Sequence, residues 1–395
     1  MAIIVQKFGG TSVGDSKKIQ NVADRVVQSI KDGDQIVVVV SAMAGVTNQL
    51  ASFCAGISDL NSESKLAEYD VALSSGEVVT AALLALALQQ RGVDAQSLLG
   101  WQLPIKTSHS FSKSLVQEID SELLIRLLDS GITPVIAGFQ GVNSDGRVTT
   151  LGRGGSDTTA AAISASIKAD YCDIYTDVEG VFTADPRLVP LARKIDLLSY
   201  QEMLEFADMG AKVLHSRAVQ IAMRYDFPIR VMSSFLNALG TTITKHSKNM
   251  ESPKIIGIAH NKNIVLTDFK FKDYKAMEDL FAEFAENDIH VESINRDTQS
   301  FVECIIQLGD IAKVQAILDR SPDITYNIRT DIAIVSIIGF SLKNDTSIFS
   351  KVLSSLARDG IEIMSMMSSQ IKLSIMVPEP ATERAVKILH GLLIC

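Results

Sequence analysis

A lysine followed by two glycines ends an apolar run near the start of the chain, in the stretch Ile3-Ile4-Val5-Gln6-Lys7-Phe8-Gly9-Gly10-Thr11-Ser12. Glycines let backbone N–H groups approach phosphate oxygens because no Cβ stands in the way, and the N-terminus of a following helix adds partial positive charge. Lys7 could direct its ammonium group at a phosphoryl group in transfer. The stretch is neither a P-loop nor a dinucleotide-binding fingerprint. It predicts an anion-binding corner; the alternative is a plain strand-turn-helix corner with a solvated lysine.

A second glycine-rich stretch surrounds an arginine, in Leu151-Gly152-Arg153-Gly154-Gly155-Ser156-Asp157-Thr158-Thr159. The planar guanidinium group of arginine suits a carboxylate, and the start of a helix suits an anion. The stretch therefore predicts a carboxylate-binding turn at a helix start. A mobile glycine hairpin is the alternative.

Two more stretches follow apolar runs that are typical of buried strands. Ser41 to Asn48 gathers small and hydroxyl residues, and Tyr175 to Arg187 combines turn formers with an arginine. Open α/β sheets bind their ligands beyond the carboxyl ends of the strands, so both stretches lie where a binding site is expected. The first could equally be a helix cap. The second could wrap a nucleotide, but by itself it is only a loop.

Short β-branched runs alternate with helical patterns through the first 245 residues. Strands are expected at 3–7, 35–41, 133–139, 171–176 and 228–232. Helices are expected at 16–31, 77–90, 118–130, 157–168 and 200–210. Strands that are apolar on both faces and separated by helices imply a mostly parallel sheet covered on both sides. The expected fold class of this part is α/β, a three-layer αβα sandwich.

The order of expected strands and helices changes beyond a polar linker at residues 244–254. A strand, a helix, two strands, a helix and a strand between residues 263 and 330 form one ferredoxin-like α+β unit. A second unit starts at residue 332 and ends on a helix, without its last strand. An open sheet edge is a liability, and the run Ile255 to His260 is the candidate to fill it. The expected domains are 1–248, then 263–330, inserted within a third domain made of 253–262 plus 331–395.

The composition limits the class of protein. The chain has 395 residues, 47% of them hydrophobic and 21% charged, which predicts a soluble globular protein of two or three domains. A net charge of -9 argues against a nucleic-acid partner, because phosphate backbones bind basic surfaces. The apolar runs are too short for a signal peptide or a membrane span, so we expect a cytoplasmic protein. Four scattered cysteines and six histidines without ligand spacing predict neither disulfides nor a protein-ligated metal.

The sequence resembles the aspartokinases of the amino acid kinase family over nearly all of residues 1 to 245. The matching stretches keep the family's order: KFGGTS from Lys7, SAMAGVTN (41–48), SSGE (74–77), AGFQG (137–141), TLGRGGSDTT (150–159), YTDVEGVFTADPR (175–187), GAKVLH (210–215) and SSF (233–235). The two smaller units resemble ACT domains, which bind regulatory amino acids in such enzymes. The resemblance implies a carbamate-kinase-like αβα fold and transfer of the ATP γ-phosphoryl group to the side-chain carboxylate of L-aspartate.

The resemblance also implies roles for individual residues. Lys7 and Asp157 would be catalytic: Lys7 contacts the phosphoryl group, and Asp157 organises Lys7 and the reacting groups. Glu77 would meet the α-ammonium of aspartate, and Arg153 its α-carboxylate. The other residues implied for the aspartate pocket are Ser41, Thr47, Gly154, Gly155 and Ser156. The residues implied to hold ATP are Lys7, Phe8, Gly9, Gly10, Thr176, Asp177, Phe182, Arg187, Lys212 and Val213.

The implied reaction needs no general base, because an aspartate side chain is already ionised near pH 7. The enzyme's task is then to position the reactants and to neutralise charge, as in other phosphoryl transfers. Mg²⁺ is expected to be held mainly by the phosphates of ATP and by water.

The regulatory half departs from the family pattern. Phe271-Lys272-Asp273-Tyr274 stands where relatives carry an Asp-x-Pro-Gly turn, and Met367-Ser368-Ser369-Gln370 stands where they read Ser-Thr-Ser-Glu. Lysine or threonine is the implied effector at these loops, and its identity stays open. Homo-oligomerisation through the ACT domains is expected. Met250, at the domain boundary, leaves open a separate ACT-only subunit started internally.

Two other functions stay open at this point. The chain could be a non-catalytic sensor that reads lysine or threonine through its ACT units, but intact Lys7, Glu77 and Arg153 argue against this. It could instead phosphorylate another acceptor, namely glutamate, acetylglutamate or UMP. The paired ACT units and the stretch Ser41 to Asn48 argue against that second alternative.

Overall fold

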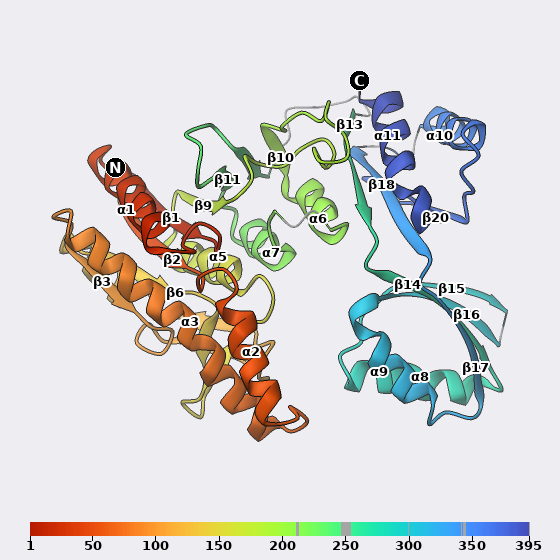
Figure 1. The fold of residues 1–395 in the computed structure, drawn as a ribbon, viewed down its shortest axis with the longest axis horizontal. Helices are drawn as coiled ribbons and strands as arrows, with labels where there is room; N and C mark the ends of the chain where they lie inside the picture. Colours follow the sequence, from red (N-terminus) through yellow and green to blue (C-terminus); the bar gives the residue numbers. More distant parts are fainter. Residues whose placement is uncertain (211–212, 246–253, 299, 341, 343–344, 395) are drawn as a thin grey trace. The chain divides into compact units, whose positions relative to one another are not determined.

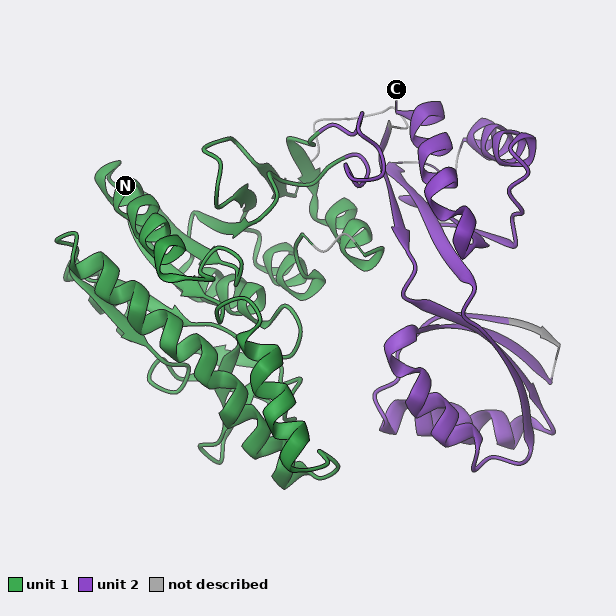
Figure 2. Ribbon diagram, in the orientation of Figure 1, with its two compact units in different colours: residues 1–182, 194–250 green, residues 183–193, 251–395 purple. Residues whose placement is uncertain are grey.

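The computed structural model describes the chain except residues 211–212, 246–253, 299, 341, 343–344 and 395 (Figure 1). The chain forms two compact units, one of residues 1–182 and 194–250 and the other of residues 183–193 and 251–395 (Figure 2). Two residues that carried predictions, Lys212 and Met250, lie outside the described part.

An eight-stranded sheet runs through the first unit in the order β10-β12-β11-β9-β1-β2-β6-β3. Its central strands pair in parallel and are β1 (Ile3–Phe8), β2 (Gln35–Val40), β6 (Thr133–Ala137) and β9 (Tyr171–Thr176). The outer strands are β3 (Ala95–Leu98), β10 (Leu197–Ser199), β11 (Ile229–Ser233) and β12 (Thr241–Thr244). Only the pairing of β11 with β12 is antiparallel among the strands of this sheet.

Helices cover both faces of this sheet. Side chains at alternate strand positions, such as Phe8 in β1 and Val38 in β2, pack in one apolar core with helices α1 (Ser16–Lys31) and α3 (Glu63–Gln89). The neighbouring position in β1, Lys7, points to the other face, where it meets helix α5 (Gly155–Ile167). Successive strand residues face opposite sides of a sheet, so the helices form two outer layers. The predicted three-layer α/β fold is confirmed (Figure 1).

The central helix α3 differs from its prediction, which placed a helix start at Glu77. The helix begins at Glu63 and continues through Ser74, Ser75 and Gly76, residues that are weak helix formers. A Cβ built on Gly76 would lie 2.7 Å from the Cβ of Ala42, so the missing side chain lets α3 approach the loop after β2. Tertiary packing therefore overrides the local propensity.

Several elements of the first unit were not predicted from the sequence. Helix α2 (Val46–Ile57) is one of them, and none of its side chains is buried. The other helices of this unit are α4 (Glu122–Asp129), α6 (Tyr200–Asp208) and α7 (Ser216–Tyr225). A small sheet in the order β5-β4-β7-β8 is made of β4 (Ile105–Thr107), β5 (Val116–Ile119), β7 (Gln140–Val142) and β8 (Val148–Thr150).

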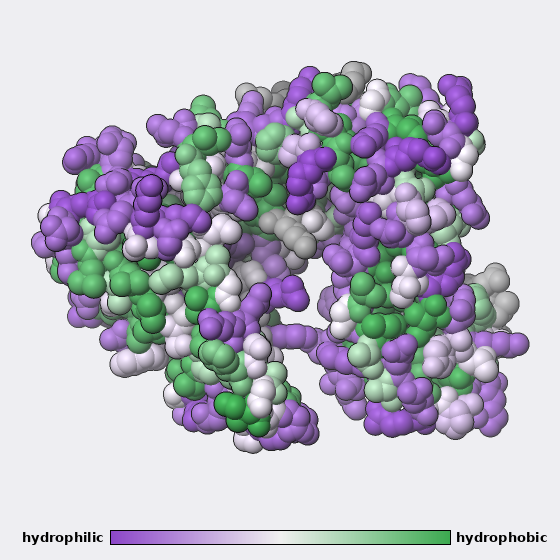
Figure 3. Space-filling view, in the orientation of Figure 1, coloured by the Kyte–Doolittle hydropathy of each residue, from purple (hydrophilic) through white to green (hydrophobic). Residues whose placement is uncertain are grey.

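Helix α3 is, among the described residues, the one helix long and apolar enough to cross a membrane. Its side chains Leu84 and Leu88 are fully buried against the sheet, and 56% of its most apolar window is buried, as expected of a core helix. Val79, Leu83 and Leu86 remain exposed, and Figure 3 shows apolar side chains along this helix.

Two four-stranded sheets form the second unit, in the orders β15-β16-β14-β17 and β13-β18-β20-β19. The first contains β14 (Ile264–Phe271), α8 (Tyr274–Glu286), β15 (Val291–Thr298), β16 (Phe301–Gln307), the short 3-10 turn Leu308–Asp310, α9 (Ile311–Leu318) and β17 (Ile324–Arg329). The second contains β13 (Lys254–Asn261), β18 (Ile332–Phe340), α10 (Thr346–Arg358), β19 (Ser365–Ser368), β20 (Lys372–Pro378), the 3-10 turn Glu379–Ala381 and α11 (Thr382–Leu393). Strand β13 pairs antiparallel with β18, although the entire first sheet lies between them in sequence. It occupies the edge that the missing last strand would leave open.

Residues 183–193 leave the first unit and pack in the second. Ala184 and Val189 join the apolar core of the β13-β18-β20-β19 sheet. The hydroxyl of Thr183 lies 2.9 Å from Nε2 of His390 in α11, and both side chains are buried. The stretch Tyr175 to Arg187, which looked continuous in sequence, is thus divided between the units after Phe182.

Candidate active site

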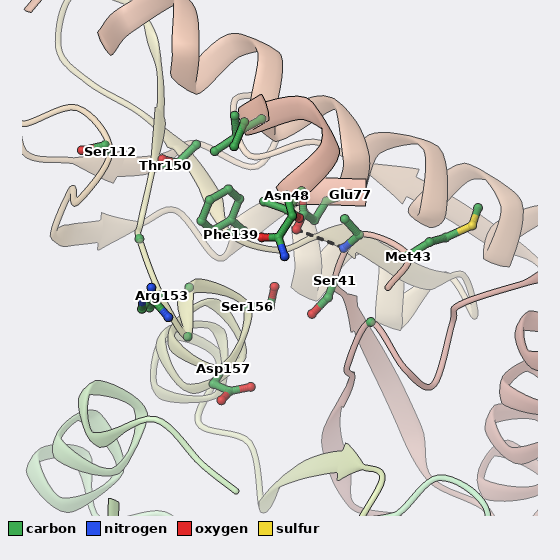
Figure 4. A pocket seen from close by; sticks show the side chains of 18 of the residues that line it. Ser41, Met43, Asn48, Glu77, Ser112, Phe139, Thr150, Arg153, Ser156 and Asp157 are labelled. Atoms are coloured by element: carbon green, nitrogen blue, oxygen red, sulfur yellow. Dashed lines mark hydrogen bonds between the residues drawn. The ribbon is translucent and has the colours of Figure 1, made fainter. Parts of the chain in front are cut away.

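A cavity of about 620 Å³ opens at the carboxyl ends of β1 and β2 (Figure 4). Its lining comes from β1, from the loop after β2, from α3 and from the start of α5, which are distant in sequence and meet at one sheet edge. Ten of the predicted site residues line it: Lys7, Gly10, Ser41, Thr47, Glu77, Arg153, Gly154, Gly155, Ser156 and Asp157.

An ion pair of Lys7 and Asp157 lies on one side of the cavity. The Lys7 Nζ atom is 2.6 Å from a carboxylate oxygen of Asp157, and their side chains are only 11% and 12% exposed. The other carboxylate oxygen accepts a hydrogen bond of 3.3 Å from the backbone N–H of His215. Lys7 comes from a rigid central strand and Asp157 from the first turn of α5. The ammonium group is therefore held in a fixed place by two regular elements.

The Glu77 carboxylate, on α3, is buried on another side of the cavity and is 3% exposed. One oxygen accepts a hydrogen bond of 3.0 Å from the Ala42 N–H, drawn as a dashed line in Figure 4. The other oxygen has no hydrogen-bond partner within the described part of the chain. Burial raises the pKa of Glu77 to about 7. This carboxylate is charged only above neutral pH and has room for a cationic partner.

Two glycines let the start of α5 close on the cavity. Gly154, the N-cap of α5, has a φ of +66°, and a Cβ built on it would lie 2.2 Å from the ring of His215. A Cβ on Gly155 would lie 2.6 Å from the ring of Phe139. A side chain at either position would force the turn away from its neighbours. The exposed Arg153 side chain precedes this turn, so the cavity has a cationic group beside a helix N-terminus.

The glycine corner after β1 is only partly available to a phosphate. The N–H of Gly9 already donates a hydrogen bond of 3.2 Å to the Tyr175 carbonyl, and the Phe8 ring is fully buried and stacked on the ring of Tyr175. Gly10 lines the cavity, and a Cβ on it would lie 2.7 Å from the Ala42 carbonyl oxygen. The glycine at position 10 is therefore required by the close approach of two loops.

The helix that follows this corner has an N-terminus that is capped by a side chain. Helix α1 begins at Ser16, and the Asp15 side chain caps it by accepting a hydrogen bond of 2.8 Å from the Lys18 N–H. A carboxylate at that position already uses the partial positive charge. Asp15 would therefore compete with a bound anion for the N-terminus of α1. The helices whose N-termini line the cavity are α2, through Gly45 and Thr47, and α5, through Gly155 and Ser156.

Of the residues predicted to hold the nucleotide, Lys7 and Gly10 line this cavity, and the other described ones do not. Thr176 and Asp177 follow β9, where the Thr176 hydroxyl donates to the Asp177 carboxylate at 3.1 Å. Phe182 forms an isolated bridge with Lys194. Arg187 belongs to the second unit, where it pairs with Asp185 at 2.7 Å. Val213 is partly buried near the start of α7.

Other residues line the cavity that were not among the predicted site residues. Asn48 and Phe139 stand in stretches that carry the family resemblance, whereas Tyr69, Leu73, Ser112 and Lys113 do not. Phe139 has a positive φ of +70° and Ser112 one of +64°, conformations that a non-glycine residue rarely adopts and that sequence does not reveal. Lys113 stands in a serine-rich loop without a periodic pattern. No sequence signal marks Tyr69, Leu73, Ser112 or Lys113, because the fold alone brings them to the site.

Comparisons with known proteins agree with one another. Residues 2–233 match the model of the amino acid kinase family, and residues 327–391 match an ACT domain model. The chain is 46% identical to an aspartokinase of Rickettsia felis and 42% identical to an aspartokinase of Geobacillus stearothermophilus, over 97% or more of each chain. Among solved structures it is similar to E. coli aspartokinase III in complex with aspartate and ADP, with a TM-score of 0.84 and 28% identity over 100% of both chains. The same E. coli enzyme in complex with lysine and aspartate gives a TM-score of 0.77 at 27% identity.

Proposed function

The chain belongs to the amino acid kinase family, and we propose that the cavity at the sheet edge is where it holds L-aspartate for phosphorylation by ATP. Its similarity to aspartokinases over its whole length makes it an aspartate kinase. Such an enzyme transfers the ATP γ-phosphoryl group to the side-chain carboxylate of aspartate and releases 4-phospho-L-aspartate and ADP. This is the first step toward lysine, threonine, methionine and diaminopimelate.

The buried Glu77 carboxylate carries the proposal for aspartate binding. One of its oxygens has no partner among the described residues, although a buried charge is costly unless it is paired. The α-ammonium of aspartate would supply that partner. Arg153 would pair with the α-carboxylate through two parallel hydrogen bonds. With both α groups held, the side-chain carboxylate is left to face the Lys7 side of the cavity.

Lys7 would neutralise charge on the phosphoryl group as it moves. An oxygen of the ionised aspartate side chain attacks the γ-phosphorus, a new O–P bond forms, and the bond to the ADP oxygen breaks. The Lys7 ammonium stabilises the negative charge that is shared among the oxygens during this exchange. Asp157 holds Lys7 in place through the 2.6 Å ion pair and takes no proton from the substrate. The N-terminus of α5 adds partial positive charge, although the Gly155 N–H itself donates a hydrogen bond of 3.0 Å to the Gly152 carbonyl.

The nucleotide subsite and the metal belong to the same proposal. We assign to ATP the residues Gly10, Thr176, Asp177, Phe182, Arg187, Lys212 and Val213, with Phe8 and Gly9 contributing through their backbone. Within the described ranges no three His, Cys, Asp or Glu side chains form a group that could hold a metal ion. We propose that Mg²⁺ is held mainly by the phosphates of ATP and by water. When bound, the ion would neutralise part of the negative charge on the phosphates.

The second unit is proposed to be regulatory and to serve oligomerisation in the cytoplasm. We assign residues 1–248 to the catalytic domain, 263–330 to an inserted ACT domain, and 253–262 plus 331–395 to the other ACT domain. Lysine or threonine would bind to these domains, and a second copy or an ACT-only subunit would pair with them. Asp273, in the loop that departs from the family pattern, caps α8 by accepting a hydrogen bond of 3.0 Å from the Ala276 N–H. The helix start is thus intact even though the usual turn is replaced.

A coupled assay tests the proposed substrate. Purified protein with ATP, Mg²⁺ and aspartate should release ADP, and hydroxylamine should trap the acyl phosphate as aspartyl hydroxamate. Glutamate, acetylglutamate and UMP serve as competing acceptors and should give far slower ADP release. Absence of ADP release with aspartate, in protein that is folded, would overturn the proposal.

The KM for aspartate is expected to rise as the pH falls from about 8 to about 6. Burial raises the pKa of Glu77 from 4.5 to about 7, so this carboxylate is charged above pH 7 and becomes neutral below it. A neutral group no longer attracts the α-ammonium, and one pH unit below the pKa the KM should have increased about tenfold. Initial rates across this pH range, at saturating ATP, measure the effect.

Two controls separate this effect from a general loss of activity. Glu77→Gln should have a high KM that no longer depends on pH in this range. Succinate, which lacks the α-ammonium, should show little change in KM with pH in the unmodified enzyme. An aspartate KM that stays constant from pH 8 to pH 6 would contradict the role assigned to Glu77.

A further inference from the structure

One buried and one half-buried polar side chain, both outside the cavity lining, hold two loops that form part of that lining. We call these the pocket loops, residues 110–114 and 149–153; they contain Ser112, Lys113 and Arg153. The side chains are Asp70, on α3, and Arg217, on α7. Both act on backbone groups, so they fix the course of the loops and do not contact the cavity directly.

Asp70 joins the two pocket loops from the α3 side. Its side chain is fully buried, and one carboxylate oxygen accepts hydrogen bonds from the N–H of Ser112 at 2.9 Å and of Thr150 at 2.7 Å. The other oxygen accepts a bond of 2.7 Å from the Thr150 hydroxyl. Burial raises the pKa of Asp70, while these three hydrogen bonds oppose that rise. Asp70 stands two helical turns before Glu77, so both carboxylates lie on the same face of α3.

Arg217 holds the same loops from α7. Its guanidinium donates hydrogen bonds to the carbonyl oxygens of Leu151 at 2.5 Å and Ser114 at 3.0 Å. Burial lowers its pKa, which marks the cost of placing this cation away from water. A rigid fork that reaches two carbonyls fixes their separation, which a lysine cannot do.

The pocket loops also touch each other directly. The Ser114 N–H donates a hydrogen bond of 2.9 Å to the Thr150 carbonyl. Gly152 has a φ of +74°, and a Cβ on it would lie 3.1 Å from the Ser112 carbonyl oxygen. Arg153 is the next residue. Its backbone position therefore depends on the contact between the loops and on the two side chains that hold them.

We propose that Asp70 and Arg217 are positioning residues for aspartate recognition, which act by fixing the backbone from which Arg153 reaches the substrate. Misplacing a substrate-binding group by about 1 Å can cost up to about 10²-fold in rate, so loss of this support should be visible in kinetics. The inference rests on the proposed role of Arg153. Neither pocket loop contains a residue assigned to ATP, so the effect should fall on the KM for aspartate and spare the KM for ATP.

Steady-state kinetics of Asp70 variants test the proposal. Asp70→Ala should raise the KM for aspartate by about tenfold, with the KM for ATP and kcat changed by less than about threefold. Asp70→Asn keeps an oxygen for both N–H groups, and its amide can donate to the Thr150 hydroxyl, so its KM should stay within about twofold of the parent enzyme. Arg217→Met, which loses both hydrogen bonds, should raise the KM for aspartate as Asp70→Ala does. Arg217→Lys, which can keep only one of them, should have a KM between those of Arg217→Met and the parent enzyme.

A matched control removes a buried carboxylate that does not hold the pocket loops. Asp173, 2% exposed, pairs with Arg230 at 2.6 Å on the central strand β9. Asp173→Asn should lower the melting temperature and leave the KM for aspartate unchanged.

The proposal is overturned if Asp70→Ala is folded and has an unchanged aspartate KM, or if it raises the KM values for ATP and aspartate equally. If Asp70→Ala does not fold, Arg217→Met decides by the same criteria. If Arg153→Met also leaves the aspartate KM unchanged, the role of Arg153 itself is wrong.

Discussion

Replacing Lys7 with methionine is expected to lower kcat by about 10³-fold, with a much smaller effect on the KM for aspartate. Lys7 is the cation that the central strand β1 delivers to the cavity, where it is 2.6 Å from Asp157. The charge that it neutralises grows during phosphoryl transfer, so the interaction is stronger in the transition state than in the ground state. Rapid-quench or steady-state assays at saturating aspartate and ATP measure the change in kcat.

A loss of stability must be separated from this loss of rate. Lys7→Met leaves the Asp157 carboxylate largely buried without its cation, which costs about 3–5 kcal/mol in comparable pairs. The double variant Lys7→Met/Asp157→Asn removes both charges and should recover much of that stability while kcat remains low. Thermal melts of both variants provide the comparison. A Lys7→Met enzyme that keeps more than about a tenth of the parental kcat would contradict the role assigned to Lys7.

Replacing Arg153 with methionine is expected to raise the KM for aspartate by about 10- to 100-fold, because a hydrogen bond to a charged group contributes about 1.5–3 kcal/mol. The arginine side chain is exposed at the cavity, beside the N-terminus of α5, so its loss should disturb the fold little. Its planar fork can meet both oxygens of the α-carboxylate. The KM for ATP should stay close to that of the parent enzyme, since Arg153 is not assigned to the nucleotide.

A substrate that lacks the α-carboxylate provides a second test of the role of Arg153. β-Alanine is aspartate without that group, and the parent enzyme should use it far less well than aspartate. In Arg153→Met the preference for aspartate over β-alanine should largely disappear, because the group that recognises the difference is gone. Arg153→Lys keeps the charge without the fork and should lie between the two. An unchanged preference in Arg153→Met would show that another residue reads the α-carboxylate.

The ends of a helix with a clear apolar period and a cap were predictable from the sequence. Helix ends that depend on packing against other segments were not. Helix α1 begins and ends at the predicted residues, Ser16 and Lys31, because it has one apolar face and an Asp cap. Helix α3 was predicted too short because its middle contains Ser74, Ser75 and Gly76, which are tolerated only through packing against Ala42. Helix α2 was not predicted, and none of its side chains is buried.

The residues of the site also differ in whether the sequence alone could reveal them. Lys7 and Arg153 stand in short glycine-rich stretches whose residue types indicate anion binding, and the role expected of Asp157 came from the family resemblance. Asp70 and Arg217 could not be found in that way, because each acts on backbone groups far away in sequence. Asp70 meets partners 42 and 80 residues further on, and Arg217 meets partners 66 and 103 residues before it.

The sequence by itself determined the layered α/β fold and the kinds of group available for phosphoryl transfer, because periodicity, glycines and charged residues act within a few positions of one another. Only the tertiary structure decided which helix N-termini line the cavity, which backbone N–H groups are already used, and where the stretch after Phe182 belongs. Those outcomes depend on contacts between distant segments, such as the Gly9 N–H with the Tyr175 carbonyl and the buried Thr183 hydroxyl with His390. Such contacts exist only once the strands and helices have packed, so no local pattern encodes them.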